Sequence, residues 1–261
     1  MANIVQPNPW QQLRQFTPAR IALGRVGNSL PTDEVLRFGF AHALAQDAVH
    51  LPLDVATLGV ALQTAHWQTL CVHSRAPDRA TYLLRPDYGR RLSDASAVAL
   101  VGYANKSCDL VFVAADGLSA LAVQRHTLPL LEALRAVLPV AWSLGPVIIV
   151  EQGRVAIGDE IGELLRARMA VVLIGERPGL SSPDSLGIYL TFAPKLGRSD
   201  AERNCVSNVR PEGLSYDAAA RRILWLLNEA SRTQLTGVGL KDHSELPEVQ
   251  VKPENSSSRI A

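Results

Sequence analysis

The chain has 261 residues, of which 47% are apolar, so it can bury a sizeable core as one large domain or two smaller ones. Its formal net charge of +1 argues against nucleic acid as the main partner, because phosphate binding needs a concentrated positive surface. The three cysteines are widely spaced, which excludes a disulfide framework and favours a reducing cytoplasm. The apolar runs have strand length, so no membrane span is expected, and the N-terminus lacks the continuous apolar stretch of a secretory signal.

The first 92 residues are predicted to form an N-terminal arm followed by a small, mostly helical domain. Residues 1–16 are polar, contain two prolines, and are expected to be a docking arm or a loose segment. Thr17-Pro18 predicts a brief helix, and a firmer helix is predicted after Thr32, with Thr32 as its cap and acidic residues in its first turn. The elements expected next are a helical segment at 55–67, paired strands at 69–72 and 82–84, and a domain boundary near residue 92.

From residue 93 to 240, strands alternate with helices. This pattern predicts an α/β domain of Rossmann-like type, in which helices flank a mainly parallel sheet. The expected elements are a helix at 93–103, a strand at 110–115, a helix at 120–136, a strand at 147–151, a helix at 159–168, strands at 170–174 and 188–192, and a final helix capped by Ser215. The tail at 241–261 is polar and Ser-rich, and is expected to be disordered.

The predicted helix at 159–168 illustrates the local chemistry behind these assignments. Apolar residues recur at helical spacing and would form one buried stripe. Asp159 lies in the first turn, and Arg166 and Arg168 lie in the last turn, so the charges complement the helix dipole.

Two segments that follow predicted strands are candidates for a binding site. The loop Gly175–Gly179 comes directly after the strand at 170–174, and ligands of open α/β sheets bind beyond the carboxyl ends of such strands. Glu176 and Arg177 in this loop would face a ligand or, alternatively, pair with each other in solvent. Asp116 follows the strand at 110–115 and would either accept hydrogen bonds from a ligand or tie its own turn.

A third candidate segment surrounds Cys205. The thiol could be a small buried apolar group. Together with Asn and Ser side chains, however, it would also suit a surface that meets a large neutral ligand carrying amide groups.

Several common enzyme motifs are missing from the sequence. It has no P-loop and no G-x-S-x-G nucleophile elbow, and Gly237-Val238-Gly239 lacks the third glycine of a dinucleotide fingerprint. The six histidines show no metal-binding spacing; His42 and His50 share one predicted helix but lack a third ligand. These absences argue against a stand-alone nucleotide-binding enzyme.

An ordered set of motifs resembles the small (light) subunit of ethanolamine ammonia-lyase. The resemblance extends over most of residues 17–240. It is carried by TPARIALGRVG, YLLRPDYGRRLSD, DGLSALAV, GRVAIGDEIGELL, LIGERPGLSSPDSLGIYLTFAP and DAERNCVSNVRPEGLSYDAAA.

This resemblance implies a subunit that covers adenosylcobalamin and has no catalytic residue of its own. Ethanolamine would be converted to acetaldehyde and ammonia on a large barrel subunit, and the two chains would form a hetero-oligomer. The cobalamin contacts carried over from the family motifs are Val155, Glu176 and Cys205. Neighbours added to them are Arg154, Arg177, Ser207 and Asn208, with Asp116 as a further candidate.

The sequence contains no D-x-H segment. The resemblance is therefore to the class in which cobalamin keeps its own base on cobalt, so no metal ligand is expected from this chain. The expected location is the cytoplasm, and residence in an ethanolamine-utilisation microcompartment stays open. The rival interpretations are a structural spacer that organises large subunits and, less favoured, a stand-alone nucleotide-binding protein.

Overall fold

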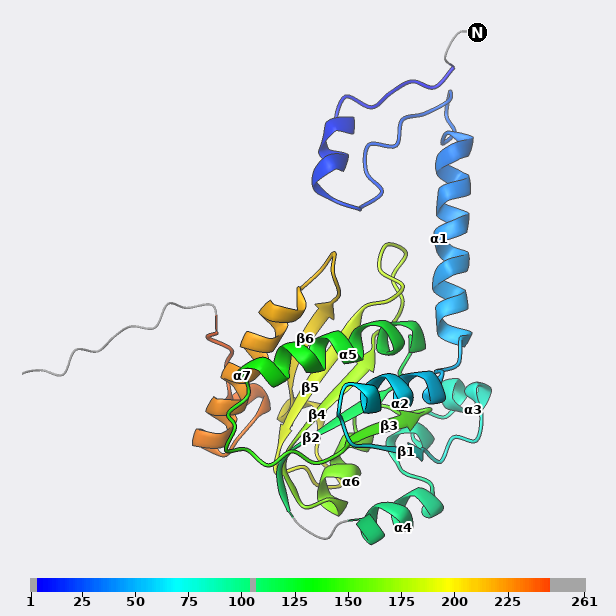
Figure 1. Ribbon diagram of the computed structural model, residues 1–261. Helices are drawn as coiled ribbons and strands as arrows, with labels where there is room; N and C mark the ends of the chain where they lie inside the picture. Colours follow the sequence, from blue (N-terminus) through cyan, green and yellow to red (C-terminus); the bar gives the residue numbers. More distant parts are fainter. Residues whose placement is uncertain (1–3, 104–106, 245–261) are drawn as a thin grey trace, which may run out of the picture.

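The computed structural model describes residues 4–103 and 107–244, and a six-stranded sheet lies at the centre of the described part (Figure 1). The strand order is β1-β3-β2-β4-β5-β6. The first four strands in this order pair in parallel, whereas β5 is antiparallel to β4 and β6 is antiparallel to β5. The strands are β1 (Thr69–His73), β2 (Cys108–Ala115), β3 (Val147–Glu151), β4 (Ala167–Gly175), β5 (Leu186–Phe192) and β6 (Asn204–Val209).

Helices cover both faces of this sheet. Side chains of α2, α5 and α7 share one apolar core with one face, and side chains of α4 and α6 share a second core with the other face. The α-helices are α1 (Thr32–His50), α2 (Val55–Thr64), α3 (Arg79–Leu84), α4 (Asp94–Tyr103), α5 (Ala120–Val137), α6 (Ile157–Leu164) and α7 (Tyr216–Thr233). The 3-10 turns are η1 (Gln11–Phe16), η2 (Tyr88–Arg90), η3 (Asp200–Glu202) and η4 (Gly237–Gly239).

The central strand β2 shows why both cores form. Leu110, Phe112 and Ala114 enter the core beneath α5, whereas Val111 and Val113 alternate into the core beneath α6. All five side chains are fully buried, which agrees with the continuous apolar run in the sequence.

The predicted α/β class is confirmed, and most predicted elements are present within a few residues. The final helix begins where predicted, and the Ser215 hydroxyl accepts a hydrogen bond from the Ala218 N–H. The mixed character of the sheet was not predicted, and β6 was missed as a strand. The connection from β4 to β5 spans only residues 176–185 and contains no helix, so it is too short for a parallel crossover.

The predicted strand at 82–84 is wrong, because these residues belong to helix α3. The Asp78 side chain accepts a hydrogen bond from the Thr81 N–H and so caps this helix. The brief helix expected after Thr17 is also wrong: a 3-10 turn precedes that residue, and its hydroxyl accepts from the Ala19 N–H. Thr32 is the first residue of α1 rather than its cap, which is Pro31.

The predicted helix at 159–168 is shorter than expected. It ends at Leu164, Arg166 adopts a left-handed φ of 52°, and Ala167 already begins β4. Arg166 and Arg168 therefore do not close the last helical turn. The predicted apolar stripe is nevertheless buried, as Ile157 and Ile161 are fully enclosed beneath the sheet.

The sheet runs across the division expected at residue 92, since β1 comes from the N-terminal side and pairs with β3 along its whole length. Most of the tail predicted at 241–261 lies outside the described residues. Within the described part of the chain, no helix has both the length and the apolar character that crossing a membrane requires.

Candidate functional site

A hollow opens at the edge of the sheet where the parallel strands end. Asp116 follows β2, Gly153 follows β3 and Glu176 follows β4, so these three connections meet there. β6 ends at the same edge, because its last residue pairs with the first residue of β5. This is the edge at which open α/β sheets bind ligands. The hollow is lined by Tyr82, Arg90, Gly117, Leu118, Arg154, Val155, Ala156, Ile174, Gly175, Glu176, Arg177, Tyr189 and Asp200.

The Glu176 carboxylate is held by several hydrogen bonds. The hydroxyl of Ser185 donates a short hydrogen bond to its Oε2. The backbone N–H of Asn208 donates to both carboxylate oxygens, with N···O distances of 3.3 and 3.4 Å. The side chain is half-buried and lies against Gly187, where an added Cβ would be 3.0 Å from the Glu176 Cγ. The carboxylate is therefore fixed at the wall of the hollow by the ends of β5 and β6.

Val155 and Arg154 reach the hollow from the connection after β3. Val155 is half-buried and gives the wall an apolar patch. The Arg154 Nη2 donates to the Tyr82 carbonyl at 2.9 Å, and its guanidinium lies 4.4 Å from the centre of the Tyr82 ring. Its backbone N–H also donates to the Gly89 carbonyl. Arg154 thus lines the site and also anchors this loop to α3 and η2.

Asp116 lies beneath the same loop and does not line the hollow. Its two carboxylate oxygens accept hydrogen bonds from the backbone N–H groups of Gln152 and Gly153, both at 2.9 Å. The Arg79 Nη1 lies 3.6 Å from the carboxylate. Burial raises the pKa of Asp116 to about 6. The sequence left open whether Asp116 binds a ligand or ties its own turn. The observed hydrogen bonds are to backbone, as in the second alternative, but they hold the loop after β3 rather than the turn of Asp116 itself.

Cys205 and Ser207 lie on the edge strand β6, beside the hollow. Both are exposed, and the Cys205 Sγ lies 3.3 Å from the Ser207 Oγ. Cys205 lies opposite Tyr189 of the neighbouring strand β5, and Tyr189 lines the hollow. Burial, together with the nearby Cys205 thiol, raises the pKa of Tyr189. The exposed thiol differs from the buried apolar group considered from the sequence.

Of the candidates, Val155, Glu176, Arg154 and Arg177 line one hollow. Asn208 contacts Glu176 from the neighbouring strand end. Cys205 and Ser207 are next to this group, and Asp116 supports it from below. Sequence reasoning missed the lining residues Tyr82, Arg90, Tyr189 and Asp200, together with the supporting residue Ser185.

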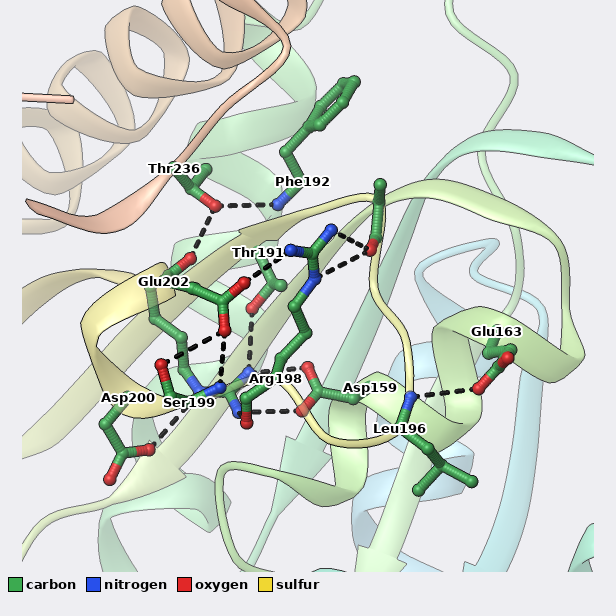
Figure 2. A network of polar contacts seen from close by, with 12 residues as sticks. Asp159, Glu163, Thr191, Phe192, Leu196, Arg198, Ser199, Asp200, Glu202 and Thr236 are labelled. Atoms are coloured by element: carbon green, nitrogen blue, oxygen red, sulfur yellow. Dashed lines mark hydrogen bonds and ion pairs between the residues drawn. The ribbon is translucent and has the colours of Figure 1, made fainter. Parts of the chain in front are cut away.

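Asp200 is presented to the hollow by the segment between β5 and β6, which Figure 2 shows from close by. Arg203 is buried and bonds the Asp159 carboxylate of α6 through both Nη atoms, at 2.5 and 2.7 Å. Ser199 and Glu202 form a capping box around η3. The S-x-x-E spacing of that box was the sequence signal that could have located this turn.

This edge offers apolar surface and hydrogen-bonding groups that suit a large ligand edged with amide groups, and three arginines, Arg90, Arg154 and Arg177, are among the residues that line it. It combines an apolar patch at Val155, a fixed acceptor at Glu176, and exposed hydroxyl and thiol groups on β6. Within residues 4–103 and 107–244, no group of three or more His, Cys, Asp or Glu side chains is placed to hold a metal ion.

Fold and site together define an α/β protein with a ligand-sized hollow at its strand ends. The model of the ethanolamine ammonia-lyase light chain family matches residues 7–241. A small subunit of ethanolamine ammonia-lyase from Pseudomonas paraeruginosa is 61% identical over 248 residues, which cover 93% of this chain and 90% of the relative. The small subunits from Pseudomonas aeruginosa and Azotobacter vinelandii are 62% and 61% identical, each over 92% of this chain and over 89% and 90% of the relative. The chain belongs to the ethanolamine ammonia-lyase light chain family.

Proposed function

We propose that this chain is the subunit of an ethanolamine ammonia-lyase complex that covers and binds adenosylcobalamin against the large subunit. The complex would convert ethanolamine to acetaldehyde and ammonia, and this chain would bind the cofactor without supplying a catalytic residue. The relatives named above are small subunits of this enzyme, which supports the assignment of partner and reaction. When bound, the cofactor supplies the radical chemistry, while the protein orients it and excludes water.

The observation that carries this proposal is the fixed carboxylate of Glu176 beside the apolar Val155. A corrin ring is broad and apolar, and amide arms project from its rim. Val155 would pack against the ring, and Glu176 would accept a hydrogen bond from an amide N–H. Cys205, Ser207 and Asn208 extend this surface along β6 and would contact the same rim.

A second surface supports assembly with a large subunit. Trp10, Phe16, Leu36 and Phe40 are each at least 67% exposed on α1 and the segment before it. Figure 1 shows α1 extending away from the sheet, with that segment at its far end. The Arg20 Nη2 donates to the Leu180 carbonyl, so the segment contacts the loop that follows Glu176. We propose that the large subunit packs on this apolar surface and continues toward the hollow. The spacer interpretation would use the same surface without a cofactor contact.

Glu176→Ala and Cys205→Ala, each reconstituted with the large subunit, test the cofactor contact. Retention of cyanocobalamin by the complex is measured by equilibrium dialysis and visible absorbance. Loss of a hydrogen bond to a charged group costs about 1.5–3 kcal/mol, so Glu176→Ala should weaken binding by about 10–150-fold. Cys205→Ala should cost less, because its thiol is a weak donor.

Glu212→Ala is the control, because this glutamate is largely exposed and does not line the hollow. It should leave cyanocobalamin binding unchanged. Wild-type affinity for both Glu176→Ala and Cys205→Ala would favour the spacer. Full activity of the large subunit alone would overturn the cofactor role as a whole.

A further inference from the structure

Two hydrogen bonds of opposite direction join Ser185 and Glu176. The Glu176 backbone N–H donates to the Ser185 carbonyl at 2.9 Å. The Ser185 hydroxyl in turn donates to the Glu176 Oε2. Ser185 is only 4% exposed and immediately precedes β5, so its position is set by the sheet rather than by solvent.

The opposite side of the carboxylate is closed by β6. Asn208 has a left-handed φ of 59°, and this conformation accompanies the contact of its N–H with both Glu176 oxygens. The Asn208 side chain accepts a hydrogen bond from the Arg210 Nε at 3.0 Å. A Cβ on Gly187 would crowd Glu176 at 3.0 Å, so the carboxylate also lies directly on the β5 backbone.

We infer that Ser185 is a positioning residue, which orients the Glu176 carboxylate so that its free lone pairs point to an amide N–H of the ligand. This inference rests on the proposed function. A carboxylate offers about four acceptor positions, and Ser185 and the Asn208 N–H occupy those on the protein side. The oxygen surface toward the hollow stays available to a donor. Fixing a flexible side chain before binding also removes its ordering cost of about 0.5–1.5 kcal/mol from the binding step.

The ligand chemistry follows from this arrangement. Because an ionised carboxylate only accepts hydrogen bonds, the position selects an N–H or O–H donor and repels another carboxylate. A primary carboxamide on the rim of a corrinoid is the donor class that meets this requirement. Ser185 would thus set affinity and orientation without taking part in bond breaking.

A double-mutant cycle in the two-subunit complex separates positioning from general structural support. The probe is cyanocobalamin, and the readout is its dissociation constant from equilibrium dialysis. Ser185→Ala should raise this constant about 5–10-fold, in line with an ordering cost near the upper end of the range given above. The Ser185–Glu176 hydrogen bond itself is present before and after binding, so its own strength cancels. In a Glu176→Ala background, Ser185→Ala should have little further effect, because the carboxylate that it orients is gone and its other side-chain contact, with the Asn208 Oδ1, is long at 3.5 Å.

Ser185→Thr and Ser181→Ala are the matched variants. The threonine keeps the hydroxyl and should restore affinity to within about 3-fold of the wild type. Ser181 is an exposed serine of the same loop, and its replacement should change nothing. Turnover with saturating coenzyme should stay near wild type in Ser185→Ala, so the defect should lie in the coenzyme concentration required.

The outcomes distinguish the proposed cofactor contact of Glu176 from the positioning role of Ser185. Wild-type affinity in Glu176→Ala would overturn the proposed cofactor contact itself. A loss in Glu176→Ala with wild-type affinity in Ser185→Ala would overturn only the positioning role. Equal losses from Ser185→Ala in both backgrounds would also overturn it, because they would show a structural effect that does not act through Glu176.

Discussion

Arg203 and Asp159 form a two-point ion pair inside the protein, with both side chains only 3% exposed. The pair joins the start of β6 to α6 and holds the segment whose Asp200 lines the hollow. The Arg203 guanidinium also donates to the Thr191 hydroxyl and the Arg198 carbonyl, so its donors are well used. A network of this kind fixes a loop geometry that solvent-exposed ion pairs cannot fix.

Arg203→Ala should destabilise the protein strongly. The variant leaves the Asp159 carboxylate buried without its cation, and breaking a buried pair in this way costs about 3–5 kcal/mol. Arg232→Ala is the control, since that arginine is 70% exposed in its pair with Glu229 and should lose less than about 1 kcal/mol. Urea denaturation measures both. Equal small losses would show that the buried pair contributes no more than an exposed one.

Asp116 should make stability fall as pH rises between about 4 and 6. Its pKa in the folded protein is about 6, above its ordinary value of 3.8, because the carboxyl is buried. The folded state therefore binds the proton more tightly than the unfolded chain, and the free energy of unfolding decreases as pH rises through this window. The shift corresponds to about 3 kcal/mol.

Asp116→Asn should remove this component, which urea denaturation from pH 4.5 to 7.5 would measure. Relative to the wild type, the variant should gain about 2 kcal/mol between pH 4.5 and 7.5. Asp109→Asn is the control, because hydrogen bonds from Ser143 lower the pKa of Asp109, and its contribution is lost only as pH falls below about 4. A constant difference between Asp116→Asn and the wild type would contradict the assignment.

The sequence predicted β2, β3 and β4 of the parallel part because each has a local signal, whereas β1 was predicted as a strand but paired with residues 82–84 instead of β3. Buried strands such as β2 are continuous apolar runs, and Ser215 caps the last helix by a contact only three residues away. The location of Glu176 at the end of a strand was predicted from the same kind of local pattern. The antiparallel pairing of β5 with β4 could have been predicted only from the short connection between them, which contains no helix.

The support of the site could not be predicted, because it depends on contacts between distant residues. Asp159 looked like a favourable charge in a first helical turn, but its partner is 44 residues away. Ser185 and Asn208 meet Glu176 only because β5 runs antiparallel to β4 and β6 runs antiparallel to β5, which brings the start of β5 and the end of β6 to the end of β4. Periodicity and capping rules describe residues that are close in sequence. They therefore cannot predict that Ser185 and Asn208 contact Glu176.

Gly175→Ala should destabilise the edge that carries the hollow. A Cβ at this position would overlap the Ser119 carbonyl and lie 2.7 Å from the Asp116 carbonyl oxygen, so backbone would have to move. Overpacking of this kind costs about 1–3 kcal/mol. Gly59→Ala is the matched control: this buried helical glycine would place its Cβ 3.8 Å from Ile149, in ordinary contact. Thermal unfolding should show a loss for the first variant and no loss for the second.

Phe40→Asp should weaken assembly with the large subunit while leaving this chain folded. Phe40 is 67% exposed on α1, so a charge there costs the isolated chain little, whereas at a buried contact it would be unpaired. We expect at least a 10-fold loss of affinity, measured by sedimentation velocity of the mixed subunits. Val140→Asp is the control, because Val140 is fully exposed on the connection between α5 and β3. Wild-type association of Phe40→Asp would place the partner on another surface, whereas an equal loss in Val140→Asp would indicate a general effect of charge rather than a contact at α1.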